Sequence, residues 1–185
     1  MFLLMEAAWF ILSSRVVFLD RDGVINEPAA AHDYIKKWDE FHFINGTPEA
    51  IHDLNMAGLK VILVTNQRGI ARNLMTMEDL EDIHCHMKEK LKEDDAFIDD
   101  IFVCPHEEGT CNCRKPKTGL FLQAEHKYNV DKMHSYMVGD SETDIQAGKN
   151  YGVRTVSIGS EDLGANHKCR NLLEAVQWII EEEKQ

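Results

Sequence analysis

Basic residues are few relative to acidic ones in this chain of 185 residues. Lysine and arginine number 20 against 32 aspartates and glutamates, and the formal net charge of -12 repels phosphate backbones and anionic lipid. We therefore expect neither a nucleic acid nor a membrane as a partner, and an anionic substrate would need locally clustered cations or a metal ion. Five cysteines, an odd number, argue against a complete disulfide framework and favour a reducing, cytoplasmic location.

Long hydrophobic runs, repeats and Pro/Gly-rich linkers are missing as well. The apolar stretch 1–14 includes Glu6, lacks a basic start and is shorter than the roughly 20 residues that span a bilayer. We interpret it as an N-terminal extension, with a signal peptide cleaved near Ser14 as the alternative. No boundary divides residues 15–185, which we expect to form a single, monomeric domain.

Short β-branched runs alternate with helical patterns along the chain. Five such runs predict strands, at residues 16–19, 61–64, 101–103, 136–138 and 155–158. Continuous apolar strands separated by helices are typical of a parallel sheet covered on both faces. The predicted fold class is α/β, a Rossmann-like three-layer sandwich with a central, mostly parallel sheet.

The intervening helices have recognisable ends. Thr47 followed by Pro48 predicts a helix start, and Gly58 predicts its end. Further helices are expected from Thr76 through Leu91, after Thr118, from Ser141 or Glu142 to before Gly152, and over 172–180. Because ligands of such sheets bind beyond the carboxyl ends of the strands, the loops that follow the strands are the candidate site.

Three of these loops carry polar side chains suited to phosphate chemistry. Two carboxylates two residues apart follow the first strand, and a metal ion that offset their repulsion would leave a nucleophile beside an acid/base. Hydroxyl and amide groups follow the second strand, and acidic residues follow the fourth. The three segments are Asp20-Arg21-Asp22-Gly23, Thr65-Asn66-Gln67-Arg68 and Gly139-Asp140-Ser141-Glu142-Thr143-Asp144. Each segment alone would pass for an ordinary polar turn.

The loop after the third strand has the composition of a metal site. Three thiols and an imidazole fall within ten residues, enough to close a tetrahedral zinc site with Cys104, His106, Cys111 and Cys113. A disulfide or metal-free thiols are the alternatives, but neither accounts for His106. Four protein ligands leave no open position, so the zinc is expected to be structural rather than catalytic.

Taken together, the loops resemble the four signature motifs of the haloacid dehalogenase superfamily of phosphotransferases. The residues that carry this resemblance are, in order, Asp20 and Asp22, Thr65, Lys115, and Asp140 with Asp144. The resemblance covers residues 16–159 and implies a haloacid dehalogenase-like fold. Residues 23–47 are too few for a helical cap domain, so the enzyme is expected to be capless, with the zinc loop shaping its entrance.

The resemblance also implies roles for these residues. Asp20 is implied to attack phosphorus and form an aspartyl-phosphate, while Asp22 protonates the leaving oxygen and later activates water. Mg2+ is implied to be held by Asp20, the backbone carbonyl of Asp22, and Asp140. Substrate and phosphate contacts are expected from Thr65, Asn66, Gln67, Arg68, Arg114 and Lys115, with Gly23, Asn26 and Asp144 in support. Asp144 is expected to orient Lys115 or a metal-bound water.

The zinc loop and the Cys-Asn-Cys-Arg-Lys-Pro-Lys run at 111–117 resemble one branch of this superfamily, which contains heptose bisphosphate and histidinol-phosphate phosphatases. Residues 65–72 and 41–46 are closer to the heptose enzymes, although Arg68 stands where their pattern has serine. The expected reaction is hydrolysis of the C7 phosphate of D-glycero-D-manno-heptose 1,7-bisphosphate, a small sugar phosphate. Alternatives are a histidinol-phosphate phosphatase, a non-catalytic zinc-binding module, and a phosphatase of nucleic-acid 3′ ends, which the negative charge disfavours.

Some suggestive residues receive no functional role. His84, Cys85 and His86 are adjacent on a helix, where neighbouring side chains point about 100° apart and cannot share one ion. We expect them on a solvated helix face, as we do Glu181 to Glu183 at the end of the last helix.

Overall fold

The computed structural model describes residues 13–30 and 33–184. Most of the predicted extension, residues 1–12, lies outside the described residues. Ser14, the last residue of that stretch, pairs with Val130, and its backbone N–H donates to the Asn129 carbonyl oxygen at 2.9 Å.

The core of the fold is a sheet of six parallel strands in the order β3-β2-β1-β4-β5-β6. The strands are β1 (Val16–Leu19), β2 (Lys60–Asn66), β3 (Asp100–Cys104), β4 (Tyr136–Gly139), β5 (Arg154–Ile158) and β6 (His167–Cys169). The three-layer α/β prediction is confirmed, and all five expected strands are present. The sixth, β6, was not predicted, because this three-residue edge strand has no apolar run to announce it.

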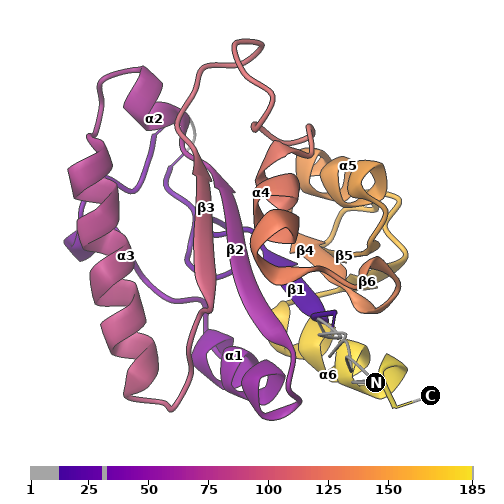
Figure 1. Cartoon of the computed structure of the whole chain (residues 1–185). Helices are drawn as coiled ribbons and strands as arrows, with labels where there is room; N and C mark the ends of the chain where they lie inside the picture. Colours follow the sequence, from indigo (N-terminus) through magenta and orange to yellow (C-terminus); the bar gives the residue numbers. More distant parts are fainter. Residues whose placement is uncertain (1–12, 31–32, 185) are drawn as a thin grey trace, which may run out of the picture.

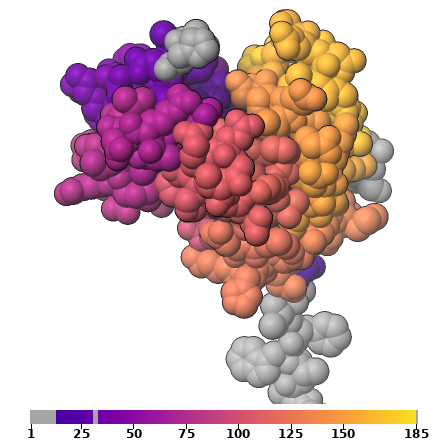
Figure 2. Space-filling view, turned by 90° about the horizontal axis from the view of Figure 1, so that it is seen from above, coloured from indigo at the N-terminus to yellow at the C-terminus, as the bar shows by residue number. Residues whose placement is uncertain are grey.

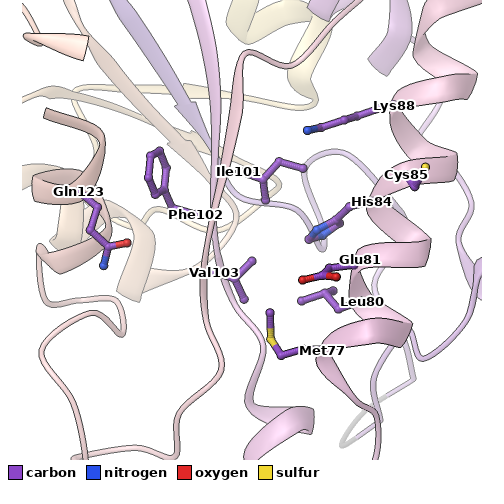
Figure 3. Close-up of a pocket in the computed structure, with 10 residues that line it drawn as sticks. All are labelled: Met77, Leu80, Glu81, His84, Cys85, Lys88, Ile101, Phe102, Val103 and Gln123. Atoms are coloured by element: carbon purple, nitrogen blue, oxygen red, sulfur yellow. The ribbon is translucent and has the colours of Figure 1, made fainter. Parts of the chain in front are cut away.

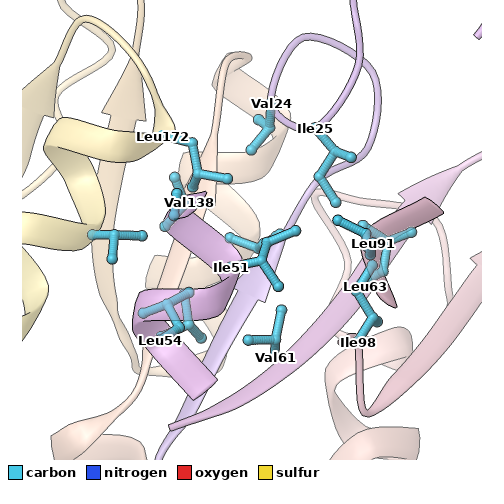
Figure 4. Close-up of a cluster of buried hydrophobic side chains, with 14 of the residues drawn as sticks. Val24, Ile25, Ile51, Leu54, Val61, Leu63, Leu91, Ile98, Val138 and Leu172 are labelled. Atoms are coloured by element: carbon cyan, nitrogen blue, oxygen red, sulfur yellow. The ribbon is translucent and has the colours of Figure 1, made fainter. Parts of the chain in front are cut away.

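Helices cover both faces of the sheet (Figure 1). Apolar residues of α1 (Thr47–Met56), α3 (Met77–Lys92) and α6 (Leu172–Glu182) pack on one face, against Val17, Leu19, Val61 and Leu63. Figure 4 shows part of this cluster. On the other face, α4 (Gly119–Tyr128) and α5 (Glu142–Tyr151) pack against Val16, Phe18, Ile62 and Val64. Alternate residues of one strand thus serve opposite layers, each fully buried aliphatic side chain contributing about 1.5–3 kcal/mol.

The helix ends follow the sequence signals with small shifts. Thr76 caps α3 by accepting from the Asp79 N–H at 3.0 Å, and Ser141 forms the same kind of capping box with Asp144 in α5. The expected cap of α1 is wrong by one residue: Gly46, with φ +83°, precedes the helix, and Thr47 is its first residue. Short elements were not predicted, namely α2 (Arg68–Ala71), η1 (Trp38–Glu40) and η2 (Lys132–His134).

All strands run in one direction, so the loops that follow them gather at one edge, the top of Figure 1. Seen from above in Figure 2, the segment after β3 lies between the region around α2 and that of α5. Within the described part of the chain, no helix has the length and apolar character to cross a membrane.

Candidate active site

Three carboxylates meet where β1 and its neighbour β4 end. Asp20 follows β1, Asp140 follows β4, and Asp144 lies in the first turn of α5; one oxygen from each lies within 4.8 Å of the others. Gly23, with φ +85°, lies so close that a Cβ there would collide with the Asp140 carboxylate, which explains the need for glycine. The side chain of Asp22 does not belong to this group.

Lys115 supplies the positive charge of this cluster from the loop after β3. Its buried Nζ lies 2.7 Å from Asp20 Oδ1, 2.6 Å from Asp144 Oδ1 and 2.7 Å from the Val64 carbonyl oxygen. Burial disfavours the charged ammonium, but Asp144 and Asp20 outweigh it and raise the pKa of Lys115 above its ordinary value. The lysine is thus a permanent cation between two carboxylates.

The backbone of Lys115 is held by the end of β2. The Lys115 N–H donates to Asn66 Oδ1 at 3.1 Å, and Asn66 Nδ2 donates back to the Lys115 carbonyl oxygen at 3.2 Å. The Asn66 side chain, expected to contact phosphate, is therefore engaged with the lysine loop.

The acidic cluster carries more negative charge than one lysine can offset. Burial raises the pKa of Asp20 to about 7, with Lys115 opposing the shift and Asp144 adding to it. Burial and the charge of Asp144 raise the pKa of Asp140 to about 6. Closely spaced carboxylate oxygens short of cations are the donor set that suits Mg2+, a hard cation, so these residues fit the metal expected from sequence.

Asp22 sits in a contrasting environment. Its carboxylate accepts from Arg21 Nη2 at 2.9 and 3.0 Å, from Asn26 Nδ2 at 3.0 Å and from Gln67 Nε2 at 3.0 Å. Burial alone would raise the pKa of Asp22, but the Arg21 guanidinium and these donors lower it. Arg21 is completely buried, and sequence reasoning missed it, although an arginine between two acids at a strand end was an available signal.

The cysteine loop brings its four expected ligands together. Cys104 Sγ lies 3.6 Å from Cys111 Sγ and 3.3 Å from Cys113 Sγ, and His106 Nδ1 lies 3.2 Å from Cys113 Sγ. All four ligand atoms fall within 4.8 Å of one another, a spacing that one tetrahedral ion could bridge. The cysteines are free thiols rather than a disulfide, and the donor set fits zinc.

The remaining expected substrate contacts lie around this centre. Thr65 is buried, and its Oγ1 accepts from Gln67 Nε2 at 2.9 Å. Arg68 forms an ion pair with Glu107 of the zinc loop. The Nη1 atom of Arg114 is buried and has no hydrogen-bond partner among the described residues.

Comparisons with known proteins agree with this geometry. A family model described as HAD-hydrolase-like matches residues 112–170. A Helicobacter pylori protein named D-glycero-beta-D-manno-heptose-1,7-bisphosphate 7-phosphatase is 35% identical over 175 residues, covering 91% of this chain and 99% of its own. A Yersinia pestis protein of the same name is 40% identical over 91% and 90% of the two chains. This chain belongs to the haloacid dehalogenase superfamily.

A solved structure supports the same membership. The D,D-heptose 1,7-bisphosphate phosphatase of B. bronchiseptica, complexed with magnesium and phosphate, superposes with a TM-score of 0.83 at 31% identity, covering 91% of this chain and 99% of that one. The haloacid dehalogenase fold predicted from the four motifs is therefore confirmed.

Two of the expectations about exposed residues of this chain are wrong. His84 is not on a solvated face: it is 8% exposed and projects from α3 toward Ile101 and Val103 of β3, beside a groove of about 550 Å³ (Figure 3). Burial and, to a smaller extent, the nearby charge of Arg21 lower the pKa of His84 to about 3. Glu183 is also mostly buried, because it accepts from Tyr136 Oη at 2.7 Å and pairs with Arg15 at 3.2 Å.

Proposed function

We propose that this protein is a Mg2+-dependent phosphatase that releases the 7-phosphate of D-glycero-β-D-manno-heptose 1,7-bisphosphate. The observation that carries the proposal is the placement of Asp20 beside Asp140 and against the buried Lys115, in a chain whose relatives at 35–40% identity bear that name. A groove of about 400 Å³ opens beside Asp140, a size that suits a small sugar phosphate. We further propose that residues 15–185 act as one cytoplasmic, monomeric domain.

The proposed reaction begins at Asp20. An Asp20 carboxylate oxygen forms a bond to phosphorus while the bond to the sugar oxygen breaks. Asp22 passes to that oxygen a proton that it must first take up from solvent, because its lowered pKa keeps the resting carboxylate ionised. Water then attacks the aspartyl-phosphate as Asp22 takes up the water proton, and inorganic phosphate and free Asp20 result. Bound to Asp20, Asp140 and the Asp22 carbonyl oxygen, Mg2+ would neutralise phosphoryl charge.

The surrounding residues orient these groups. Lys115 offsets the charge on Asp20 and on the phosphoryl oxygens, and Asp144 fixes the lysine from its other side. In this proposal Thr65 and Gln67, which are hydrogen-bonded to each other, contact the phosphoryl group, and the unpaired Nη1 of Arg114 donates to another substrate group. A zinc ion held by Cys104, His106, Cys111 and Cys113 would order the loop that ends in Arg114 and Lys115.

The test is initial phosphate release from the heptose bisphosphate, histidinol phosphate and a 3′-phosphorylated oligonucleotide, with Mg2+ and with EDTA. We expect Mg2+-dependent turnover dominated by the heptose bisphosphate, and Asp20→Asn should abolish it while retaining substrate binding. Dominant turnover of histidinol phosphate would refute the substrate, and full activity of Asp20→Asn would refute the covalent mechanism.

A further inference from the structure

Arg21 and His84 each bury a polar atom that meets no hydrogen-bond partner among the described residues. The atoms are Arg21 Nη1 and His84 Nε2. Arg21 is fully buried, and His84 is 8% exposed. Because native proteins satisfy nearly all of their buried polar groups, each of these two atoms requires an explanation.

The guanidinium of Arg21 spends only part of its donor set on Asp22. Nε lies 3.3 Å from Asp22 Oδ1, and Nη2 lies 2.9 and 3.0 Å from the two carboxylate oxygens. Nε and Nη2 share one edge of the planar guanidinium, so Nη1 is directed away from Asp22 and leaves its N–H donors unused. The group that orients Asp22 is therefore held on one edge only.

His84 offers the complementary group. Burial lowers the pKa of His84 to about 3, and a neutral imidazole has one donor and one acceptor nitrogen. The ring also lines the groove between α3 and β3, where Nδ1 can carry the proton and donate to water. Nε2 is then an acceptor, which matches the unused donors of Arg21.

The fold brings the two side chains to the same layer. Leu19 of β1, and Ile101 and Val103 of β3, pack in the apolar cluster that α3 covers. Arg21 follows Leu19 by two residues, the spacing that returns a side chain to the same face of a strand. His84 projects from α3 toward Ile101 and Val103 (Figure 3), and the charge of Arg21 reaches its ring.

We propose that His84 is a positioning residue, whose Nε2 accepts a hydrogen bond relayed from Arg21 Nη1 by one bound water, and that this link holds the guanidinium that orients Asp22. A water between a buried donor and a buried acceptor satisfies both. Proton transfer requires an Asp22 oxygen held within hydrogen-bond reach of the sugar oxygen. The effect on turnover rests on the proposed function, whereas the link itself does not.

The first test reads the tautomer of His84 in the unaltered protein loaded with zinc and Mg2+. In nitrogen-15 NMR of labelled histidine and arginine, we expect a protonated Nδ1, an unprotonated Nε2, and an Arg21 Nη1–H signal that exchanges slowly with water. A protonated Nε2 would make this atom a donor and would overturn the proposal. This measurement needs no substrate and no variant.

The second test compares kcat and KM for the heptose bisphosphate in variants of His84. His84→Met removes the acceptor and should lower kcat about tenfold, with KM changed less than about twofold. His84→Gln, whose Oε1 can replace Nε2 as the acceptor, should return kcat to within about twofold of the unaltered protein. His86→Met is the matched control, at a side chain that is 44% exposed on the same helix, and should change neither constant.

A histidine that merely fills space between α3 and β3 predicts the opposite order of the variants. The apolar His84→Met would then keep kcat, and His84→Gln would lower it by burying an unpaired amide. That order would overturn the positioning role, as would equal kcat in all of the proteins. If the unaltered protein releases no phosphate from the heptose bisphosphate, the proposed function fails, and the tautomer of His84 still decides whether the link exists.

Discussion

The acidic cluster predicts that Asp20→Asn stabilises the metal-free protein while abolishing turnover. Asp20 has a pKa of about 7 in the fold against an ordinary 3.8, so the folded state holds a proton that the unfolded chain releases. Protonated Asp20 therefore lets the folded state keep its full stability below pH 3.8, and this stability relative to the unfolded chain is lost as the pH rises through 7. The neutral amide of the variant would carry no such cost, and its advantage over the carboxylate should be about 2 kcal/mol at pH 5 and about 4 kcal/mol at pH 8.

The assay is equilibrium urea unfolding in EDTA at pH 5 and pH 8. Asp22→Asn provides a matched control of opposite sign, because donors from Arg21, Asn26 and Gln67 lower the pKa of Asp22. Its loss should destabilise the fold by about 2–3 kcal/mol at both pH values, since both lie above the ordinary pKa of 3.8. Added Mg2+ should stabilise the unaltered protein more than Asp20→Asn.

A specific result would refute this account of the cluster. If the stability difference between Asp20→Asn and the unaltered protein is the same at pH 5 and pH 8, the Asp20 carboxylate is not destabilised by burial and by its acidic neighbours. If Asp22→Asn is stabilising, the assignment of opposite environments to the two aspartates fails as well.

Three further outcomes are expected. Burial holds His84 neutral with a pKa of about 3, so the free energy of unfolding should fall by about 2 kcal/mol between pH 7 and pH 5 in the unaltered protein. In His84→Met this fall should be absent, and an equal change with pH in urea unfolding of both proteins would contradict the assignment. Cys111→Ser should lower bound zinc, measured by elemental analysis, and reduce kcat by less than Lys115→Ala does; full zinc with full activity would exclude the metal site. Gln67→Ala should reduce kcat about tenfold by freeing the carboxylate of Asp22, and an unchanged pH–rate profile with unchanged kcat would argue against its positioning role.

The sequence predicted the sheet and the loops well because both signals are local. Apolar runs such as 61–64 mark buried strands, and the strand ends bring Asp20, Thr65 and Asp140 to one edge whatever the details of the connections. The resemblance to the four family motifs placed Lys115 in the site with Asp20, and in the structure β3 lies two strands from β1 at the same end of the sheet.

Contacts between distant segments were beyond such reasoning. The hydrogen bond from Gln67 to Asp22, those between Asn66 and Lys115, and the burial of His84 depend on how distant segments pack against one another. His84 follows the buried Ile83 in the helix, but the polarity of its side chain favoured an exposed position. Its burial depends on the packing of α3 against the rest of the fold, including Arg21 in the loop after β1, which the sequence pattern does not show.

The pair of hydrogen bonds between Asn66 and the Lys115 backbone separates two tasks within the loop after β3. The Lys115 end of this loop is hydrogen-bonded to Asn66 of β2, and the cysteines and His106 meet at the expected zinc site. Residues 107–110 take part in neither set of contacts. Length changes in that stretch can therefore alter what the entrance admits without moving the ammonium group that faces Asp20. A scaffold arranged in this way can acquire new substrates by insertion or deletion at its rim while its reacting groups stay in place.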